Sequence, residues 1–283
     1  MTYKPRSCFG LPIIGFTFAE LACKTWDDLK DAASLGISLG EESITDYLLL
    51  TLKKKHALDV TVRKFTKKQE AGCGADWEWW FTNGTSWAGL RMFVQAKKID
   101  ASSKCYLALE PEGDQIKNLI SVSRRRRVYP LLCFYNFWRG YPTQKYCSKN
   151  WYICGWPSLS KKFWGCALAP ARAVKCGKSN KLSDILNISI PWMCVFCQSM
   201  PISPDKSFPP PLPNRVHSLV KEFEKECKSD TDDMVGFEVL HSAPDYILKT
   251  NAGYEIDFER YPIEDRPNGI AIIADDEETD YEK

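Results

Sequence analysis

Hydrophobic residues recur in helical and strand-like patterns along the first half of the chain. Apolar side chains spaced three and four residues apart predict helices over residues 18–34 and 41–55. Alternating apolar and polar residues predict strands over residues 59–65, 75–81 and 90–97. Two helices are therefore expected before three consecutive strands.

A further helix is predicted over residues 112–127, and the continuous apolar run over residues 129–137 is suited to a buried strand. From residue 41 onward, the predicted order is helix, strand, strand, strand, helix, strand. We therefore expect an α/β fold in which helices flank a mixed central sheet.

The pattern weakens after residue 137, where cysteines and aromatic residues are frequent and only short helices are indicated. Prolines then accumulate, which is typical of a stiff linker, and the chain ends in a mostly acidic stretch. The predicted division is a core with its N-terminal helix (1–137), a Cys-rich and aromatic-rich appendage (138–202), a Pro-rich linker (203–213) and a C-terminal helix with an acidic tail (214–283).

The composition narrows the class of protein. With 44% hydrophobic and 26% charged residues, the 283-residue chain is typical of a soluble globular protein. The net charge of +2 does not indicate a nucleic-acid binder, so any such surface must come from local clustering.

An apolar stretch over residues 9–19 loosely imitates a signal peptide, but Pro12 and Gly15 interrupt it. No apolar run of about 18 residues occurs, so we expect a cytoplasmic protein without a membrane span.

An acidic residue on one predicted strand is followed by a Gln-x-Lys pair on the next. Because side chains alternate along a strand, Gln95 and Lys97 project from one face, and Asp76 and Glu78 share a face of the neighbouring strand. Hydrolysis of a phosphodiester needs a divalent cation held by oxygen ligands and a further cation that steadies the developing charge. These residue types therefore indicate metal-dependent phosphodiester hydrolysis.

The arrangement resembles the PD-(D/E)XK nuclease superfamily, and Gln-Ala-Lys at 95–97 is similar to the Gln-x-Lys variant of Mrr-type restriction endonucleases. The resemblance covers residues 41–136 and implies a restriction endonuclease-like core. It implies that Asp76 is the principal metal ligand, that Gln95 offers its carbonyl in place of the usual acid, and that Lys97 positions or activates the water. Uncharacterised bacterial proteins carry a stretch similar to GADWEWW at 74–80, which implies the same activity.

The family also places a Glu on the helix before the first strand, where this chain has Glu41 and Glu42. Glu41 lines up with Leu48 and Leu52 on the helix face that packs against the sheet, whereas Glu42 lies farther round the helix. We therefore prefer Glu41 as the fourth catalytic residue and third metal ligand. Glu42 and Glu78 are secondary candidates.

Gln115 is also a secondary candidate, because relatives often keep a Gln near the phosphate on the helix after the third strand. The alternative is an ordinary solvated helix residue.

Four consecutive arginines end the same predicted helix: Arg124, Arg125, Arg126 and Arg127. They suit contact with DNA phosphates, and they equally suit the favourable placement of cations at a helix C-terminus.

The connection between the second and third strands decides whether the site can form. A tight turn at 83–84 would place Asp76 opposite Arg91, and Gln95 would then lie about 13 Å away at strand spacing. One metal ion could not bridge that separation. A broad loop over 82–89 would instead place Asp76 opposite Gln95, and we predict this loop.

Cysteine spacing gives one further candidate site. Cys194 and Cys197 have the spacing of half a zinc site, but no second pair of this kind exists in the sequence. We therefore favour ordinary buried thiols over structural zinc.

These observations and the resemblance predict a metal-dependent endonuclease that hydrolyses phosphodiester bonds of DNA, with Mg²⁺ or Mn²⁺ as cofactor. The resemblance alone implies a setting in bacterial antiviral defence. A role for a homodimer or for a partner protein of a defence system is left open. The alternative is a catalytically inactive nucleic-acid-binding or assembly module of the same fold. A third interpretation is a surface salt-bridge cluster of Asp76, Glu78 and Lys97 on an unrelated α/β protein.

Overall fold

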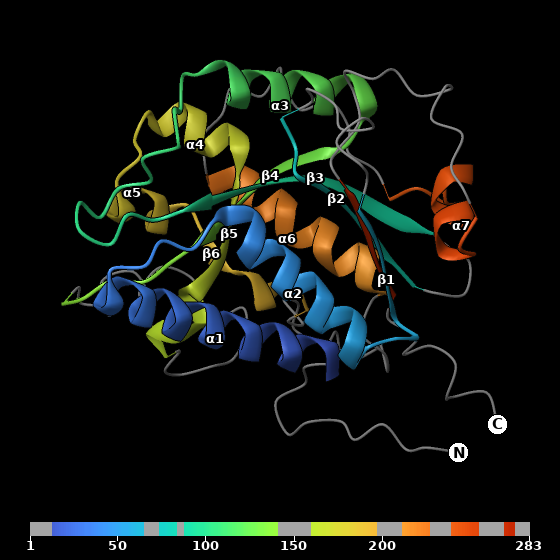
Figure 1. The fold of residues 1–283 in the computed structure, drawn as a ribbon. Helices are drawn as coiled ribbons and strands as arrows, with labels where there is room; N and C mark the ends of the chain where they lie inside the picture. Colours follow the sequence, from blue (N-terminus) through green and yellow to red (C-terminus); the bar gives the residue numbers. More distant parts are fainter. Residues whose placement is uncertain are drawn as a thin grey trace, which may run out of the picture.

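A mixed sheet organises the fold in the computed structural model of the chain (Figure 1). The structure describes residues 13–64, 74–83, 88–140, 160–196, 211–226, 239–254 and 269–274. The strands are β1 (Val60–Lys64), β2 (Trp77–Thr82), β3 (Gly89–Lys98), β4 (Tyr129–Tyr135), β5 (Cys166–Pro170), β6 (Ile190–Pro191) and β7 (Gly269–Ala274). Within the described residues they form one seven-stranded sheet in the order β1-β7-β2-β3-β4-β5-β6. The pairs β2–β7 and β3–β4 are parallel and the other pairs are antiparallel.

Helices cover both faces of this sheet (Figure 1). The α-helices are α1 (Ile13–Leu35), α2 (Glu41–Lys55), α3 (Asp114–Arg126), α4 (Ala171–Gly177), α5 (Leu182–Asn187), α6 (Leu212–Glu226) and α7 (Asp245–Asn251). The described residues also form the short 3₁₀ helices η3 (Lys161–Gly165) and η4 (Trp192–Phe196). α1, α2 and α6 pack on one face, while α3 and α4 pack together over the other. The expected mixed α/β class is confirmed.

The charges of α2 and α3 favour both helices where they form. α2 begins with Glu41 and Glu42 and ends with three lysines, and α3 begins with Asp114 and ends with three arginines. Acids near a helix N-terminus and cations near its C-terminus each interact favourably with the helix dipole. Among the described residues, no helix is both long and apolar enough to cross a membrane.

Aromatic rings fill the space between the sheet and α1. Trp79 of β2 lies edge-on to Phe18 of α1, with the ring centroids 6.3 Å apart. Phe18 also packs on Trp192 and Phe196 of η4, at centroid distances of 4.4 and 4.7 Å. All four side chains are buried, and such ring pairs add about 0.5 to 1.5 kcal/mol each beyond area burial. N-terminal and C-terminal segments therefore share one core.

The C-terminal half belongs to the same sheet, which differs from the predicted appendage and tail. β5 and β6 extend the sheet beyond β4, and β7 lies between β1 and β2. The helix predicted from residue 214 begins at Leu212, so the predicted linker overlaps its first turn. Residues 203–210 and the acidic end from residue 275 lie outside the described residues.

β7 explains why the predicted division differs from the structure. Its sequence, GIAIIA, is an apolar run of the kind that is buried on both faces of a sheet. A run of this kind does not reveal which strands it pairs with, because that depends on chain segments far away in sequence. The strand also sits close to β2, since a Cβ on Gly269 would lie 2.3 Å from the ring of Trp77.

Removing β7 is expected to prevent cooperative folding. A chain ending at residue 268 leaves β1 without its strand partner and exposes the flank of β2. Thermal unfolding followed by circular dichroism should then show no cooperative transition, whereas a chain ending at Ala274 should keep one. A cooperative transition in the shorter chain would show that residues before β7 fold independently.

Candidate active site

The register between β2 and β3 brings the candidate residues opposite one another. Trp77 lies opposite Val94 and Glu78 opposite Phe93, so Asp76 follows the same register opposite Gln95. The Asp76 amide donates to the Val94 carbonyl at 2.9 Å, which continues the pairing. The prediction of a broad connection is confirmed, because a tight turn would have placed Asp76 opposite Arg91.

β3 extends beyond the start of β2, and this leaves two backbone amides without a strand partner on that side. The Ala96 amide instead donates to Asp76 Oδ2 at 2.7 Å, and the Lys98 amide donates to Glu41 Oε1 at 2.7 Å. Glu41 is the first residue of α2, so a helix and a strand each direct a carboxylate to the same edge of β3. The preferred glutamate of the sequence thus lies beside β3, and Glu42 is exposed.

Gln95 directs its carbonyl oxygen into the site because its amide nitrogen is already held. Nε2 donates to the Gly74 carbonyl at 2.7 Å, whereas Oε1 is buried and has no hydrogen-bond partner among the described residues. Gly74 has a left-handed backbone with φ of +79°, and a Cβ there would lie 2.8 Å from the Gln115 carbonyl. Only glycine fits this close approach to α3, and because the Gly74 carbonyl can only accept a hydrogen bond, the Gln95 amide turns Nε2 toward it and Oε1 away.

Lys97 is a buried cation whose described contacts do not neutralise it. The residue is 5% exposed, and Nζ donates to Gln115 Oε1 of α3 at 2.9 Å. It forms no ion pair with a carboxylate of the described residues. Since a buried charge is costly without a paired charge, an anion bound beside Nζ would be stabilised.

Asp76 is the acid with the clearest electrostatic signature. Burial raises its pKa from 3.8 to about 6, although the Ala96 amide and the charge of Lys97 both lower it. The nearby carboxylates of Glu41 and Glu42 raise it further. Such a shift at a site of converging polar groups is typical of a functional residue.

Glu78 does not join the cluster. Its carboxylate accepts hydrogen bonds from Arg91 Nε at 2.9 Å and from the Tyr246 hydroxyl of α7. The structure therefore brings together Glu41, Asp76, Gln95, Lys97 and Gln115, and ties Glu78 to a separate buried ion pair.

The donors present fit a hard divalent cation. The carboxylates of Asp76 and Glu41 and the unpartnered Gln95 oxygen are oxygen ligands of the kind that Mg²⁺ and Mn²⁺ prefer. In the part of the chain that the structure describes, no group of three or more His, Cys, Asp or Glu side chains could hold a metal ion. The Gln95 oxygen and further non-protein ligands would therefore have to complete the shell.

The zinc hypothesis gains no second ligand from the structure. Cys194 is a buried cysteine of η4 that forms no disulfide, and Cys197 lies outside the described residues.

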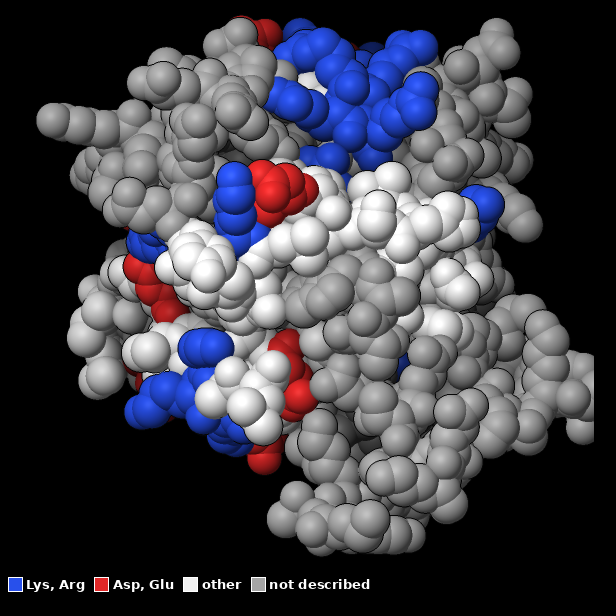
Figure 2. Space-filling model, turned by 90° about the vertical axis from the view of Figure 1, so that its right-hand side faces the viewer, with Lys and Arg blue, Asp and Glu red and all other residues white. Residues whose placement is uncertain are grey.

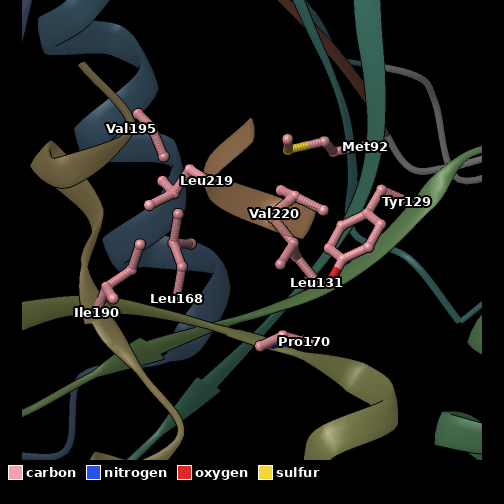
Figure 3. A pocket seen from close by; sticks show the side chains of 9 residues that line it. All are labelled: Met92, Tyr129, Leu131, Leu168, Pro170, Ile190, Val195, Leu219 and Val220. Atoms are coloured by element: carbon pink, nitrogen blue, oxygen red, sulfur yellow. The ribbon is translucent and has the colours of Figure 1, made fainter. Parts of the chain in front are cut away.

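A pocket between the sheet, η4 and α6 is lined by apolar side chains such as Met92, Leu131 and Leu219 (Figure 3). Alternation along β3 places Met92 on the opposite face of the sheet from Gln95. This pocket is therefore separate from the candidate active site.

Fold and site together define an α/β protein with a buried acid, amide and lysine cluster at the edge of a central strand. A family model matches residues 16–279, and the chain belongs to this family of unknown function, DUF6615. No curated protein and no solved structure matched the chain. The family assignment therefore carries no activity, and functional inference rests on the site.

Sequence reasoning did not single out Gly74 or Tyr246. Gly74 begins the GADWEWW stretch, and a glycine two residues before a candidate metal ligand is a usable signal for close backbone approach. Tyr246 offers no such signal, because it is 168 residues away from Glu78 in the chain.

Asp76→Asn is expected to stabilise the metal-free fold at neutral pH. The folded protein holds the Asp76 proton more tightly than the unfolded chain does, since the pKa rises from 3.8 to about 6. The resulting stability is present below about pH 4 and is lost as pH rises through about 6. Asn avoids this loss and can still accept from the Ala96 amide. The free energy of unfolding at pH 7 should therefore rise by about 1 to 2 kcal/mol.

Urea unfolding with EDTA at pH 7 and pH 4 measures this difference. The stabilisation should shrink at pH 4, because Asp76 is protonated in the folded wild type at this pH and no buried charge remains to be removed. Asp46→Asn is a matched control, because Asp46 is an exposed carboxylate paired with Lys64. Destabilisation of Asp76→Asn at pH 7 would contradict the inferred buried charge.

Gln95→Glu is expected to destabilise the fold at pH 8. A carboxylate would face the Gly74 carbonyl with two acceptors and no donor, close to the carboxylate of Asp76. A loss of about 2 to 3 kcal/mol is expected from the buried unpaired charge. Gln115→Glu makes the same exchange beside Lys97, where the new carboxylate would pair with Nζ, and should therefore not lower stability. Equal stabilities for Gln95→Glu and wild type would refute the amide orientation.

Proposed function

We propose that the protein is a metal-dependent endonuclease that hydrolyses phosphodiester bonds of DNA. The observation that carries this proposal is the buried Gln95 oxygen without a partner, beside Asp76 and the buried cation of Lys97. An acceptor of this kind needs a ligand, and a divalent cation would satisfy it. The resemblance to PD-(D/E)XK nucleases supports the same assignment.

Asp76, Gln95 and Glu41 would hold Mg²⁺ or Mn²⁺ through oxygen atoms. When bound, the cation would supply Lewis-acid polarisation of the phosphate and lower the pKa of a coordinated water. The chain's own residues have distinct tasks. Glu41 and Asp76 remain anchored by the Lys98 and Ala96 amides, so their carboxylates are positioned before any ligand arrives.

Lys97 would bind the negative charge that develops on the phosphate. Its Nζ donates to Gln115, which fixes the direction of the ammonium group without neutralising it. A preorganised charge in a buried site stabilises a developing anion more strongly than a solvated one does. Gln115 is therefore assigned a positioning role rather than a catalytic one.

The setting follows from the proposed activity and the resemblance. A nuclease of this class would act on invading DNA in the cytoplasm of a bacterium, as part of antiviral defence. Cutting both strands of a duplex would require either the two active sites of a homodimer or two successive binding events at one site.

A nucleic-acid-binding module without catalysis is a second candidate function. The observation that favours it is the small number of acidic ligands, since the described residues contain no group of three or more His, Cys, Asp or Glu side chains around a metal position. In that case Lys97 and the arginines of α3 would bind a phosphate backbone that is not cleaved.

Cleavage of plasmid DNA with Mg²⁺ or Mn²⁺ tests the proposal. Asp76→Asn and Lys97→Met should each lower the cleavage rate at least about 100-fold, because each removes charge stabilisation at the reacting phosphate. Asp46→Asn and Lys64→Met alter an exposed ion pair of the same residue types and should leave the rate unchanged. Metal-dependent cutting that survives in both site variants would contradict the proposed site. DNA binding without cutting by the wild type would favour the binding module.

A further inference from the structure

α3 connects the candidate active site to a basic cluster at its other end. In the first turn, Gln115 accepts a hydrogen bond from Lys97. The last turn and the C-cap carry Arg124, Arg125, Arg126 and Arg127, which we call the arginine end. Arg126 is half-buried and the other three are exposed. At 1.5 Å per residue, the arginine end begins about 14 Å and finishes about 18 Å from Gln115 along the helix axis.

The exposed side of α3 between these points is suited to a polyanion. Asp114 is the only acidic residue of this helix, and it precedes Gln115. Lys117, Asn118 and Ser121 follow along the accessible side. Figure 2 shows Lys and Arg side chains gathered into one patch at the top of the view, where Figure 1 places the C-terminal end of α3.

Arg127 is the C-cap residue of α3, a position that glycine would fill more easily, so helix capping alone does not explain the arginine there. Its φ of 52° and ψ of 43° are left-handed, a conformation that glycine adopts without the steric cost of a side chain. Lys178 caps α4 in the same conformation, but its charge is paired with Glu112 at 2.9 Å. Arg127 forms no ion pair with the described residues. Its guanidinium is therefore available to an external anion.

The spacing between site and cluster is fixed by packing. Ile116, Leu119 and Val122 are buried on the inner side of α3, so the helix cannot slide along the sheet. A duplex holds its phosphates at a fixed rise of 3.4 Å per base pair, which a single strand does not. A separation of about 14 to 18 Å therefore corresponds to about four to five base pairs.

We propose that the arginine end binds the phosphate backbone of duplex DNA about four to five base pairs from the phosphate held at Lys97. α3 then sets the minimum length of duplex that the protein requires on one side of the cut. This inference rests on the proposed nuclease function and specifies its substrate.

Binding of a labelled duplex of about 24 base pairs, measured by fluorescence anisotropy with Ca²⁺ over a range of salt concentrations, tests the contact. Arg127→Gly should weaken binding roughly 3- to 10-fold and reduce the slope of log affinity against log salt by about 1. Its melting temperature should stay equal or rise, because glycine relieves the left-handed cap. Lys178→Gly makes the matched change on α4 and should leave DNA affinity unchanged.

The length requirement is tested by the cut positions on end-labelled duplexes. Wild type should avoid cutting within about four base pairs of one end, and Arg127→Gly combined with Arg124→Ala should relax that limit. Unchanged affinity and salt slope in Arg127→Gly, or equal binding of single strands, would overturn the inference even if cleavage is established. If Arg127→Gly loses DNA binding but the wild type cuts no DNA, the contact between the arginine end and DNA would be supported and the proposed nuclease activity would be contradicted.

Discussion

The candidate site depends on backbone amides that the sheet leaves without a strand partner. β3 continues to Lys98 while β2 begins only at Trp77, so two successive amides on that side of β3 need other acceptors. Buried amides are almost always hydrogen-bonded, and here the carboxylates of Asp76 and Glu41 satisfy them. A requirement of sheet geometry thus brings two acids to one edge of a strand, independently of any reaction there.

The same arrangement places charge where it lowers stability. Asp76 is partly buried with a raised pKa, Lys97 is buried beside a neutral amide, and the Gln95 oxygen has no described partner. Gly74 adopts a left-handed backbone to hold the Gln95 amide in this orientation. Unfavourable features that cluster in this way are expected where a ligand completes the interactions.

α3 has a structural role and a functional one. Its inner side chains pack on the sheet, its first turn orients Lys97, and its end presents arginines to solvent. The rest of the sheet supports this geometry, because β4 runs parallel to β3 and β7 covers the other edge of β2. Segments from both ends of the chain are therefore needed to hold β2 and β3 where they, with the first turn of α2, position the site residues.

The sequence by itself determined the local elements and the convergence of Asp76 with Gln95. Helical and strand periods depend on neighbouring residues. Of the two strand pairings considered, only one placed Asp76 and Gln95 close enough to bind the same metal ion. Glu41 was also preferred correctly as the glutamate nearer the sheet, from its position on the helix face. Only the tertiary structure decided that β7 enters the sheet beside β2 and that Tyr246 and Arg91 hold Glu78 away from the site. Those contacts join residues far apart in the chain, and no local pattern encodes which distant partner an apolar strand or a buried carboxylate will meet.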